Sequence, residues 1–416
     1  MADGPAIVVL SSLFPSQVQP GAGLFIRERM FRVGRQLPLA VVAPVPWFPL
    51  QGVLRRLRPG FRPGAPRREQ QAGHEVWFPR FLSVPGVLKR FDGLMMALGA
   101  WPRLRALRRA GRLDLIDAHF AYPDGYAATL LGRWLGVPVT ITLRGTEARL
   151  AKDPLLAPLV RRALQGATQV LAVSESLRQV AIGLGLPSDR VRVVGNGVDL
   201  ARFHPMPRDE ARRLLDLPAD APVLISVGGL VERKGFHRVI ELLPALRARW
   251  PGLRYLVVGG PSPEGDMGPD LRRQVAHLGL QDAVRFVGPV APDQLRPLLS
   301  AADLFVLATR NEGWANVFLE AMACGLPVVT TDVGGNAEVV CRPELGTVVP
   351  FGDAERLLAA IDAALAEPRD AATLRRYAED NTWDRRVDDL LTLFRGLRPR
   401  GRAGAADRWH PTETSR

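Results

Sequence analysis

Short apolar segments alternate with stretches of helical pattern along almost the whole chain. In the first half these segments predict strands at Ile7–Leu10, Leu39–Ala43, His74–Phe78, Leu115–His119, Val137–Leu143, Gln169–Val173 and Val191–Val194. In the second half they predict strands at Val223–Val227, Arg254–Val258, Val284–Val287, Leu304–Leu307, Pro327–Thr330 and Gly346–Val349. Apolar strands that alternate with helices are typical of parallel sheets covered by helices on both faces. The pattern therefore predicts an α/β protein.

Gly and Pro interrupt this pattern near the middle of the chain. The stretch GNGVD at 195–199 is followed by FHPMP at 203–207, and such residues mark a linker. A chain of 416 residues also exceeds one ordinary core. We predict two doubly wound, Rossmann-like domains, with ligands bound beyond the carboxyl ends of their strands in a cleft between them. The predicted parts are residues 1–200, residues 201–380, a helix over 381–398 and a disordered Arg/Gly/Ala-rich tail over 399–416.

The positive charge of the chain lies in its first half. Residues 1–200 contain 27 Lys or Arg and 13 Asp or Glu, whereas residues 201–416 contain 28 and 29. The excess concentrates over 55–68 and 89–112. A patch of this kind attracts phosphates, nucleic acid or an anionic bilayer. Nucleic acid is disfavoured, because the chain has no recognition motif for it. A solvated, Arg-rich face is the alternative.

One basic segment also carries apolar residues at helical spacing. Lys89 and Arg90 lie beside this apolar set, which consists of Val87, Leu88, Phe91, Leu94, Met95, Leu98 and Trp101. The pattern fits a helix that lies on a membrane surface, and it fits an ordinary core-facing helix equally well.

The remaining composition favours a cytoplasmic protein. The chain has no apolar run long enough to span a membrane, and its N-terminus leads directly into a predicted strand rather than a signal peptide. Its two cysteines, Cys324 and Cys341, lie among strand and helix residues. We expect two buried free thiols in a reducing compartment. No Cys or His cluster has the spacing of zinc ligands, so no metal site is expected.

Two glycine-containing stretches follow predicted strands. Gly21 and Gly23 precede a helix and allow the backbone to approach an anion, although a plain turn explains them equally well. In the second half, SVGGLVERKGF at 226–236 leaves a strand through Gly228 and Gly229. Arg233 and Lys234 then stand where cations can meet phosphates. Lysine occurs at only three positions of this chain against 52 arginines, which hints that a compact ammonium is required at Lys234.

A pair of glutamates follows the predicted strand Leu304–Leu307. Glu312 lies in the exit loop, and Glu320 lies on a helix that we predict over Val317–Cys324. The first amides of that helix, at 315–317, form an anion site that the helix dipole supports. Carboxylates on either side of a diphosphate could each bind vicinal hydroxyls, which ribose and hexoses offer. The pattern therefore predicts a sugar nucleotide as the ligand. The alternative is one carboxylate stabilising the helix dipole and one exposed helical glutamate.

The spacing Glu312-x7-Glu320, followed by Gly-x-Pro, resembles the glutamate-pair signature of family-4 retaining glycosyltransferases of the GT-B fold. Other segments are similar to that family in the same order. They are DAHFAYPDG at 117–125, TLRGTE at 142–147, the passage 174–199 ending in NGVD, and FVG at 286–288. The similarity extends to the helix near Trp383, which in such folds crosses back to the first domain.

The resemblance implies roles for particular residues. His119, Lys234 and Glu312 would be catalytic, with Lys234 and Arg233 neutralising the diphosphate, and Arg144 and Glu147 would lie on the acceptor side. The implied donor-binding set is Gly23, Gly228, Gly229, Arg233, Lys234, Val287, Glu312, Gly313, Trp314, Ala315, Asn316, Val317 and Glu320. The chain departs from the family at Gly229, where an arginine is usual, and at Glu147, where aspartate is common. No Asp-x-Asp pair occurs, so a metal-bridged diphosphate is not expected.

The expected function is retaining transfer of a sugar from a UDP-, GDP- or ADP-sugar to a hydroxyl of a glycan or lipid-linked acceptor. No cofactor is expected beyond this donor, and no nucleic acid is expected as a partner. Cell-surface polysaccharide synthesis on the inner face of the cell membrane, with an anionic membrane surface as a partner, would suit the basic first half. The alternatives are an isomerase similar to sugar-nucleotide 2-epimerases and a non-catalytic GT-B binding protein.

Overall fold

The computed structural model describes residues 4–49, 51–57, 64–84, 86, 88–262 and 264–397. The chain divides into two compact units. The first consists of Met1–Thr142, Asp153–Val170 and Leu390–Arg416, and the second of Leu143–Lys152 and Leu171–Asp389. The domain limits at 200 and 380 stay a prediction, and the tail predicted over 399–416 lies outside the described residues.

The first sheet has eight strands in the order β10-β9-β8-β7-β1-β2-β5-β4. Their bounds are β1 Ile7–Leu10, β2 Leu39–Val42, β4 Arg68–Gln71, β5 His74–Trp77, β7 Leu115–His119, β8 Val139–Leu143, β9 Gln169–Ala172 and β10 Val191–Val193. Strands β8, β7, β1, β2 and β5 are parallel to one another, as predicted. Two shorter strands, β3 Val45–Trp47 and β6 Arg80–Leu82, form a separate parallel pair.

The prediction of parallel strands is wrong at the edge of this sheet, where β4 runs antiparallel to β5. The two strands are joined by Ala72 and Gly73, whose φ angles of 46° and 83° are both positive. Two-residue hairpin turns need this geometry. The polar sequence REQQ of β4 concealed the strand, because an edge strand does not require a continuous apolar run.

The helices up to residue 183 are α1 Leu24–Val33, α2 Gln51–Leu57, α3 Asp92–Arg109, α4 Tyr126–Leu135, α5 Glu147–Leu150, α6 Ala157–Gly166 and α7 Glu175–Gly183. Helix α3 buries Met96, Ala97, Ala100, Leu104 and Leu107. Helix α3 therefore packs against a core, as the core-facing interpretation predicts, although three members of the apolar set are exposed. Leu88 is 61% exposed, Leu98 51% and Phe91 40%. Val87 lies outside the described residues.

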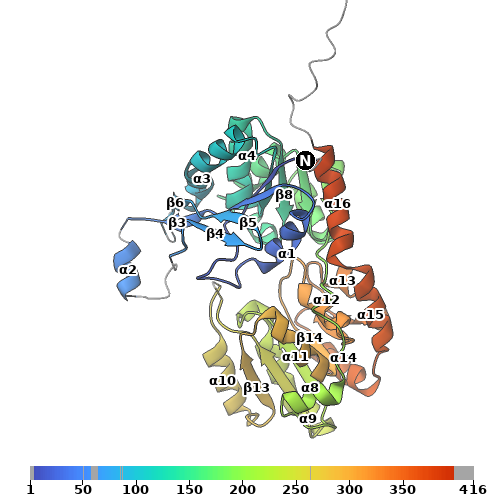
Figure 1. Ribbon diagram of the computed structural model, residues 1–416. Helices are drawn as coiled ribbons and strands as arrows, with labels where there is room; N and C mark the ends of the chain where they lie inside the picture. Colours follow the sequence, from blue (N-terminus) through green and yellow to red (C-terminus); the bar gives the residue numbers. More distant parts are fainter. Residues whose placement is uncertain are drawn as a thin grey trace, which may run out of the picture. The chain divides into compact units, whose positions relative to one another are not determined.

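The second sheet has six parallel strands in the order β13-β12-β11-β14-β15-β16. Their bounds are β11 Val223–Val227, β12 Arg254–Val258, β13 Val284–Gly288, β14 Leu304–Leu307, β15 Val328–Thr331 and β16 Gly346–Val349. The remaining helices are α8 Arg208–Leu214, α9 Phe236–Arg249, α10 Gly268–His277, α11 Leu295–Ala301, α12 Asn316–Ala323, α13 Asn336–Val339, α14 Ala354–Ala366, α15 Ala371–Asp380 and α16 Trp383–Gly396 (Figure 1).

Helices cover both faces of the second sheet, because its strands are apolar on both sides. Val223 and Ile225 of β11 pack in one core with residues of α11, α12 and α15. Leu224, between them, packs in another core with residues of α9, α10 and α14. Successive side chains of a strand point to opposite faces, so this alternation places one helical layer on each side.

The order of strands reverses beside β11. From β11 the chain builds β12 and β13 toward one edge of the sheet, and β14 then pairs with the other side of β11. In open α/β sheets, ligands bind beyond the carboxyl ends of the strands at such a switch point. The fold therefore indicates a ligand site at the loops that follow β11 and β14.

Both cysteines are free thiols, but only one is buried. Cys324 is buried at the end of α12, whereas Cys341 is exposed. The expectation of two buried thiols is wrong for Cys341, which follows the short helix α13 and lies 3.5 Å from the Tyr377 hydroxyl.

Candidate functional site

The exit loops of β11 and β14 meet at the switch point through Lys234 and Glu312. The Nζ atom of Lys234 lies 2.6 Å from Oε1 of Glu312. The same oxygen lies 3.2 Å from the Thr309 hydroxyl and 3.3 Å from Nη1 of Arg233. Glycine at 228 leaves room for this arrangement, because a Cβ there would lie 3.3 Å from Cε of Lys234. The structure thus brings together a cation and a carboxylate that the sequence placed 78 residues apart.

Arg233 is held mainly by a carboxylate that the sequence reasoning missed. Its Nε and Nη2 atoms donate to the two oxygens of Glu264 at 2.6 and 2.8 Å, and Nη1 donates to the Asn311 carbonyl at 3.2 Å. The hydrogen bonds from Glu264 raise the pKa of Arg233, and the same bonds lower the pKa of Glu264. The sequence gives one indication of Glu264, because it is an acidic residue in a Gly/Pro-rich loop that follows a predicted strand. Gly229 packs against the same loop, because a Cβ at that position would lie 3.2 Å from Cβ of Ser262.

Helix α12 begins at Asn316, one residue before the predicted start, and ends at Ala323. Ala315 precedes it without a side-chain cap, and the first amides of an α-helix have no partner within the helix. These amides and the positive end of the helix dipole suit an anion. The amides at 315–317 thus follow the Glu312 loop directly, and anion binding by them stays a prediction.

Glu320 lies in the second turn of α12 and is half-buried. Burial, with a contribution from the Glu320 charge, raises the pKa of the Cys324 thiol to about 12. The carboxylate thus lies near the carboxyl end of this short helix, whereas Glu312 precedes its amino end. The assignment of Glu320 to vicinal hydroxyls of the donor stays a prediction.

Arg144 and Glu147, expected on the acceptor side, have partners within the second unit. Arg144 donates from Nη1 to Oδ1 of Asn196 at 2.7 Å, and Nδ2 of Asn196 donates to Oδ1 of Asn316 at 2.8 Å. Glu147 accepts from the backbone amides of Arg144 and Gly145 at 3.0 and 2.8 Å. The Trp314 ring packs on Gly195, 3.0 Å from where a Cβ would stand.

His119 and Gly23, the predicted site residues of the first unit, lie at the ends of β7 and the start of α1. His119 is fully buried, with Nε2 3.3 Å from Oδ2 of Asp117. Burial favours a high pKa for Asp117, but the His119 charge and the hydrogen bonds of His119 and Thr140 outweigh it and lower that pKa. Gly23 precedes α1 in a left-handed conformation with φ of 67°. The catalytic role of His119 and the donor-binding role of Gly23 stay predictions.

Val287 lies near the carboxyl end of β13, half-buried against the core of the second sheet. Its place in the donor-binding set stays a prediction. Among the residues that the structure describes, no group of three or more His, Cys, Asp and Glu side chains is arranged to hold a metal ion.

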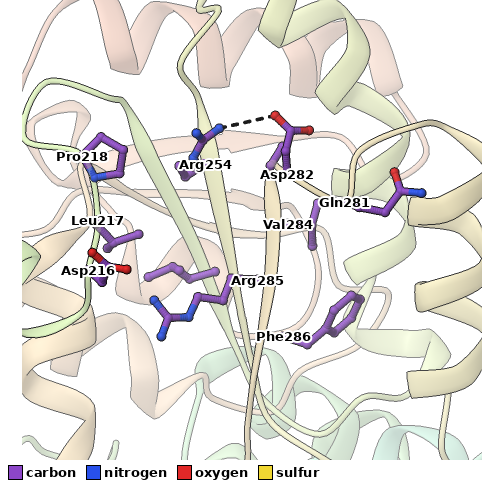
Figure 2. Close-up of a pocket in the computed structure, with 11 residues that line it drawn as sticks. Asp216, Leu217, Pro218, Arg254, Gln281, Asp282, Val284, Arg285 and Phe286 are labelled. Carbon is purple, nitrogen blue, oxygen red and sulfur yellow. Dashed lines mark ion pairs between the residues drawn. The ribbon is translucent and has the colours of Figure 1, made fainter.

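A separate cavity of about 370 Å³ lies on the second sheet, beside the amino ends of β12 and β13. Two of its lining residues form an ion pair, with Nη1 of Arg254 3.7 Å from Oδ2 of Asp282 (Figure 2). Its other lining residues are Asp216, Leu217, Pro218, Leu256, Gln281, Ala283, Val284, Arg285 and Phe286. None of the predicted donor-binding residues lines it. The two sites therefore occupy opposite ends of the parallel strands.

Two parallel-sheet, Rossmann-like α/β domains with a charged switch-point site define the GT-B class of glycosyltransferases. Solved structures of that kind are similar to the whole chain. Sucrose-phosphate synthase from Thermosynechococcus elongatus aligns with a TM-score of 0.75 at 22% identity, over 95% of this chain and 99% of that one. HepE from Anabaena in complex with UDP aligns with a TM-score of 0.71 at 19% identity, over 94% and 99%.

Sequence comparison gives the family. The description "Glycosyltransferase Family 4" matches residues 59–202, and "Glycosyl transferases group 1" matches residues 207–381. The D-inositol 3-phosphate glycosyltransferase of Acidothermus cellulolyticus is 33% identical over 74% of this chain and 72% of its own length. The putative teichuronic acid biosynthesis glycosyltransferase TuaC of Bacillus subtilis is 30% identical over 92% of each chain. The chain belongs to the family-4 glycosyltransferases.

Proposed function

We propose that this glycosyltransferase takes its sugar from a nucleotide-sugar donor whose diphosphate binds at the switch point of the second sheet. The convergence of Lys234, Arg233 and Thr309 on one oxygen of Glu312 carries the proposal, because it places a compact cation against the loop that leads into α12. Structures of HepE with UDP and with UDP-glucose share this fold, which supports a donor of that kind.

Lys234 would exchange partners when the donor binds. Its ammonium lies 2.6 Å from a carboxylate oxygen of Glu312, and the two side chains are only 15% and 9% exposed. A diphosphate would attract Lys234, and the Glu312 carboxylate would then accept hydrogen bonds from hydroxyls of the transferred sugar. Glu320 would bind ribose hydroxyls at the other end of the donor. The helix amides at 315–317 would hold the phosphate.

The reaction would proceed with retention and without a metal. The bond between the anomeric carbon and the diphosphate oxygen breaks, and the acceptor oxygen bonds to the anomeric carbon from the same face. The acceptor proton passes to the departing phosphate oxygen. Preorganised positive groups are most effective where negative charge develops, which is the role of Lys234 and the α12 amides.

A glycan or lipid-linked acceptor at an anionic membrane surface would suit the first unit. Leu88, Phe91 and Leu98 are exposed beside Lys89 and Arg90, and exposed apolar groups with basic neighbours suit attachment to anionic lipid. None of the helices in the described part of the chain is both long and apolar enough to span a bilayer. Peripheral attachment and a role in cell-surface polysaccharide synthesis, as in the printed name of TuaC, follow as proposals.

Vesicle co-sedimentation tests the membrane surface. We expect the protein to sediment with anionic vesicles at low salt and a Leu88→Ser/Phe91→Ser variant to sediment less. Leu214→Ser is the matched control, because Leu214 is 64% exposed on α8. Equal sedimentation of all three proteins, or none with the wild type, would contradict this part of the proposal.

Ligand-induced thermal stabilisation tests the donor. A ligand that binds only the folded state raises Tm, so we expect one sugar nucleotide among UDP-, GDP- and ADP-sugars to give the largest rise. Mass spectrometry of the reaction should show an acceptor heavier by one sugar, and NMR should show that the product keeps the anomeric configuration of the donor. An isobaric product from the donor alone would instead identify an epimerase-like isomerase. Donor binding with no turnover would identify a binding protein.

A further inference from the structure

The loop that carries the proposed donor-binding residues, Glu312–Asn316, is enclosed by the backbone of two other turns. A Cβ on Gly313 would lie 2.2 Å from the Arg144 carbonyl oxygen, and a Cβ on Gly334 would lie 1.7 Å from that of Glu312. Such distances leave no room for a side chain at either position. The path of the donor loop is therefore defined by the turns at 144–145 and 334–335, all within the second unit.

The turn at 144–145 is fixed by a buried carboxylate. Glu147 is fully buried, and its Oε2 atom accepts from the amides of Arg144 and Gly145 at 3.0 and 2.8 Å. A carboxylate that accepts two backbone amides holds them more tightly than a neutral acceptor would. Glu147 thereby fixes the carbonyl of Arg144 against which Gly313 packs.

A second connection runs through side chains to the first residue of α12. Arg144 donates to Asn196 at 2.7 Å, and Asn196 donates to Asn316 at 2.8 Å. Arg144 is 9% exposed and Asn196 3% exposed. Buried hydrogen bonds are costly to leave unmade, so this chain resists displacement of Asn316. Asn316 stands where α12 presents its first amides to the proposed phosphate site.

We propose that Glu147, Arg144 and Asn196 are positioning residues of the donor site: they hold the Gly313–Asn316 backbone and the start of α12 in the geometry that a donor diphosphate requires. The proposal rests on the proposed function. It gives Arg144 and Glu147 a different task from contact with the acceptor. Their loss should weaken donor binding when no acceptor is present.

The sharpest variant is Asn196→Asp. The new carboxylate still accepts from Arg144 but cannot donate to Oδ1 of Asn316, so only the link to α12 is broken in the side-chain orientation that Asn316 has in the structure. Asn196→Ala breaks both links. Glu147→Ala removes the acceptor of two amides, whereas Glu147→Gln keeps a side-chain oxygen that can accept from them.

Asn381→Ala is the matched control. Asn381 lies in the same unit and is 9% exposed; its Nδ2 donates to the Tyr377 carbonyl at 2.9 Å, and its Oδ1 accepts from Arg386. It therefore has the same buried, arginine-linked chemistry as Asn196 without a bond to the donor loop. Loss of stability alone should affect Asn381→Ala and Asn196→Ala similarly.

Isothermal titration with UDP, GDP and ADP, together with Tm, tests the proposal. For the diphosphate that the wild type binds, we expect Kd to rise about tenfold for Asn196→Asp and Asn196→Ala, as for the loss of about 1.4 kcal/mol. Glu147→Ala should behave like them, Glu147→Gln should recover most of the affinity, and Asn381→Ala should bind as the wild type does.

Wild-type Kd values in the folded Asn196→Asp and Glu147→Ala proteins, with a raised KM for the acceptor, would overturn the positioning role in favour of acceptor contact. If Asn381→Ala weakened diphosphate binding as much as Asn196→Ala does, the loss of affinity would reflect general destabilisation. That result would also overturn the positioning role. A wild type that binds none of the three diphosphates would instead contradict the proposed function, and the inference would fall with it.

Discussion

The two ends of the second sheet both carry arginines and carboxylates, but they are built differently. At the carboxyl ends of β11 and β14, Lys234 and Arg233 converge on a Glu312 oxygen that is almost shielded from solvent. At the amino ends of β12 and β13, Arg254 and Asp282 lie 3.7 Å apart in an open cavity. The strand order reverses between β11 and β14, so that the loops diverge only there. In this protein, topology and close backbone packing favour the carboxyl end as the donor site, whereas the volume of a hollow would favour the amino end.

Removal of one cation from each end of the sheet should distinguish the two sites by the largest effect. Lys234→Ala should lower turnover by about 10²-fold or more, the range for losing one key electrostatic stabiliser. Arg254→Ala, at the other end, should leave turnover within about twofold of the wild type, because surface pairs contribute little. Steady-state kinetics on the two variants measures the contrast. Equal rates for both would show that the switch point is not the reacting site.

Truncation of the second glutamate should have a smaller effect. Glu320→Ala is expected to weaken donor binding by about tenfold, because hydrogen bonds to a charged group contribute about 1.5–3 kcal/mol. Glu355→Ala, at the first turn of α14, serves as the control for loss of a helical glutamate charge. Titration with the donor measures both. An unchanged Kd for Glu320→Ala would remove its assigned role.

The ion pair between Arg233 and Glu264, at the carboxyl end of the sheet, should make the stability of the protein depend on pH. Since the pKa of Glu264 is lowered in the folded protein, the pair contributes stability above the ordinary glutamate pKa, and that contribution is lost as pH falls through the lowered value. We therefore expect Tm of the wild type to fall slightly more than Tm of Glu264→Gln below about pH 4.5. Parallel Tm curves for the two proteins would contradict this.

The smallest effect concerns the thiols. Burial raises the pKa of Cys324 to about 12, so its thiolate is scarce at pH 8, whereas Cys341 is exposed. Labelling of the folded protein with an alkylating agent at pH 8 should modify Cys341 and spare Cys324. A Cys341→Ser variant should then remain unlabelled until it is unfolded. Rapid labelling of that variant would show that the end of α12 is open to solvent.

The sequence predicted the buried strands well because their apolar runs are continuous. Strands β1, β7, β11, β12, β14 and β16 have the predicted bounds. Strands β3 and β6 are three residues long, and β4 is polar, so none of them has such a run. The start of α12 was predicted one residue late.

The sequence indicated those parts of the candidate site that lie in loops after predicted strands. Lys234 lies in the loop after β11 and Glu312 in the loop after β14, and these neighbouring parallel strands bring the two loops to the same edge of the sheet. Glu264 lies 31 residues from Arg233, and Asn196 lies 120 residues from Asn316. Such pairings depend on how loops fold against one another, and no local pattern in the sequence indicates them.

A structure of the protein with a bound nucleoside diphosphate would show which end of the second sheet holds the donor. We expect the phosphates to lie within hydrogen-bond reach of Lys234 Nζ and of the first amides of α12, with Glu312 released from the ammonium. A diphosphate found instead in the cavity that Arg254 and Asp282 line, with the Lys234–Glu312 ion pair intact, would contradict a donor site at the switch point.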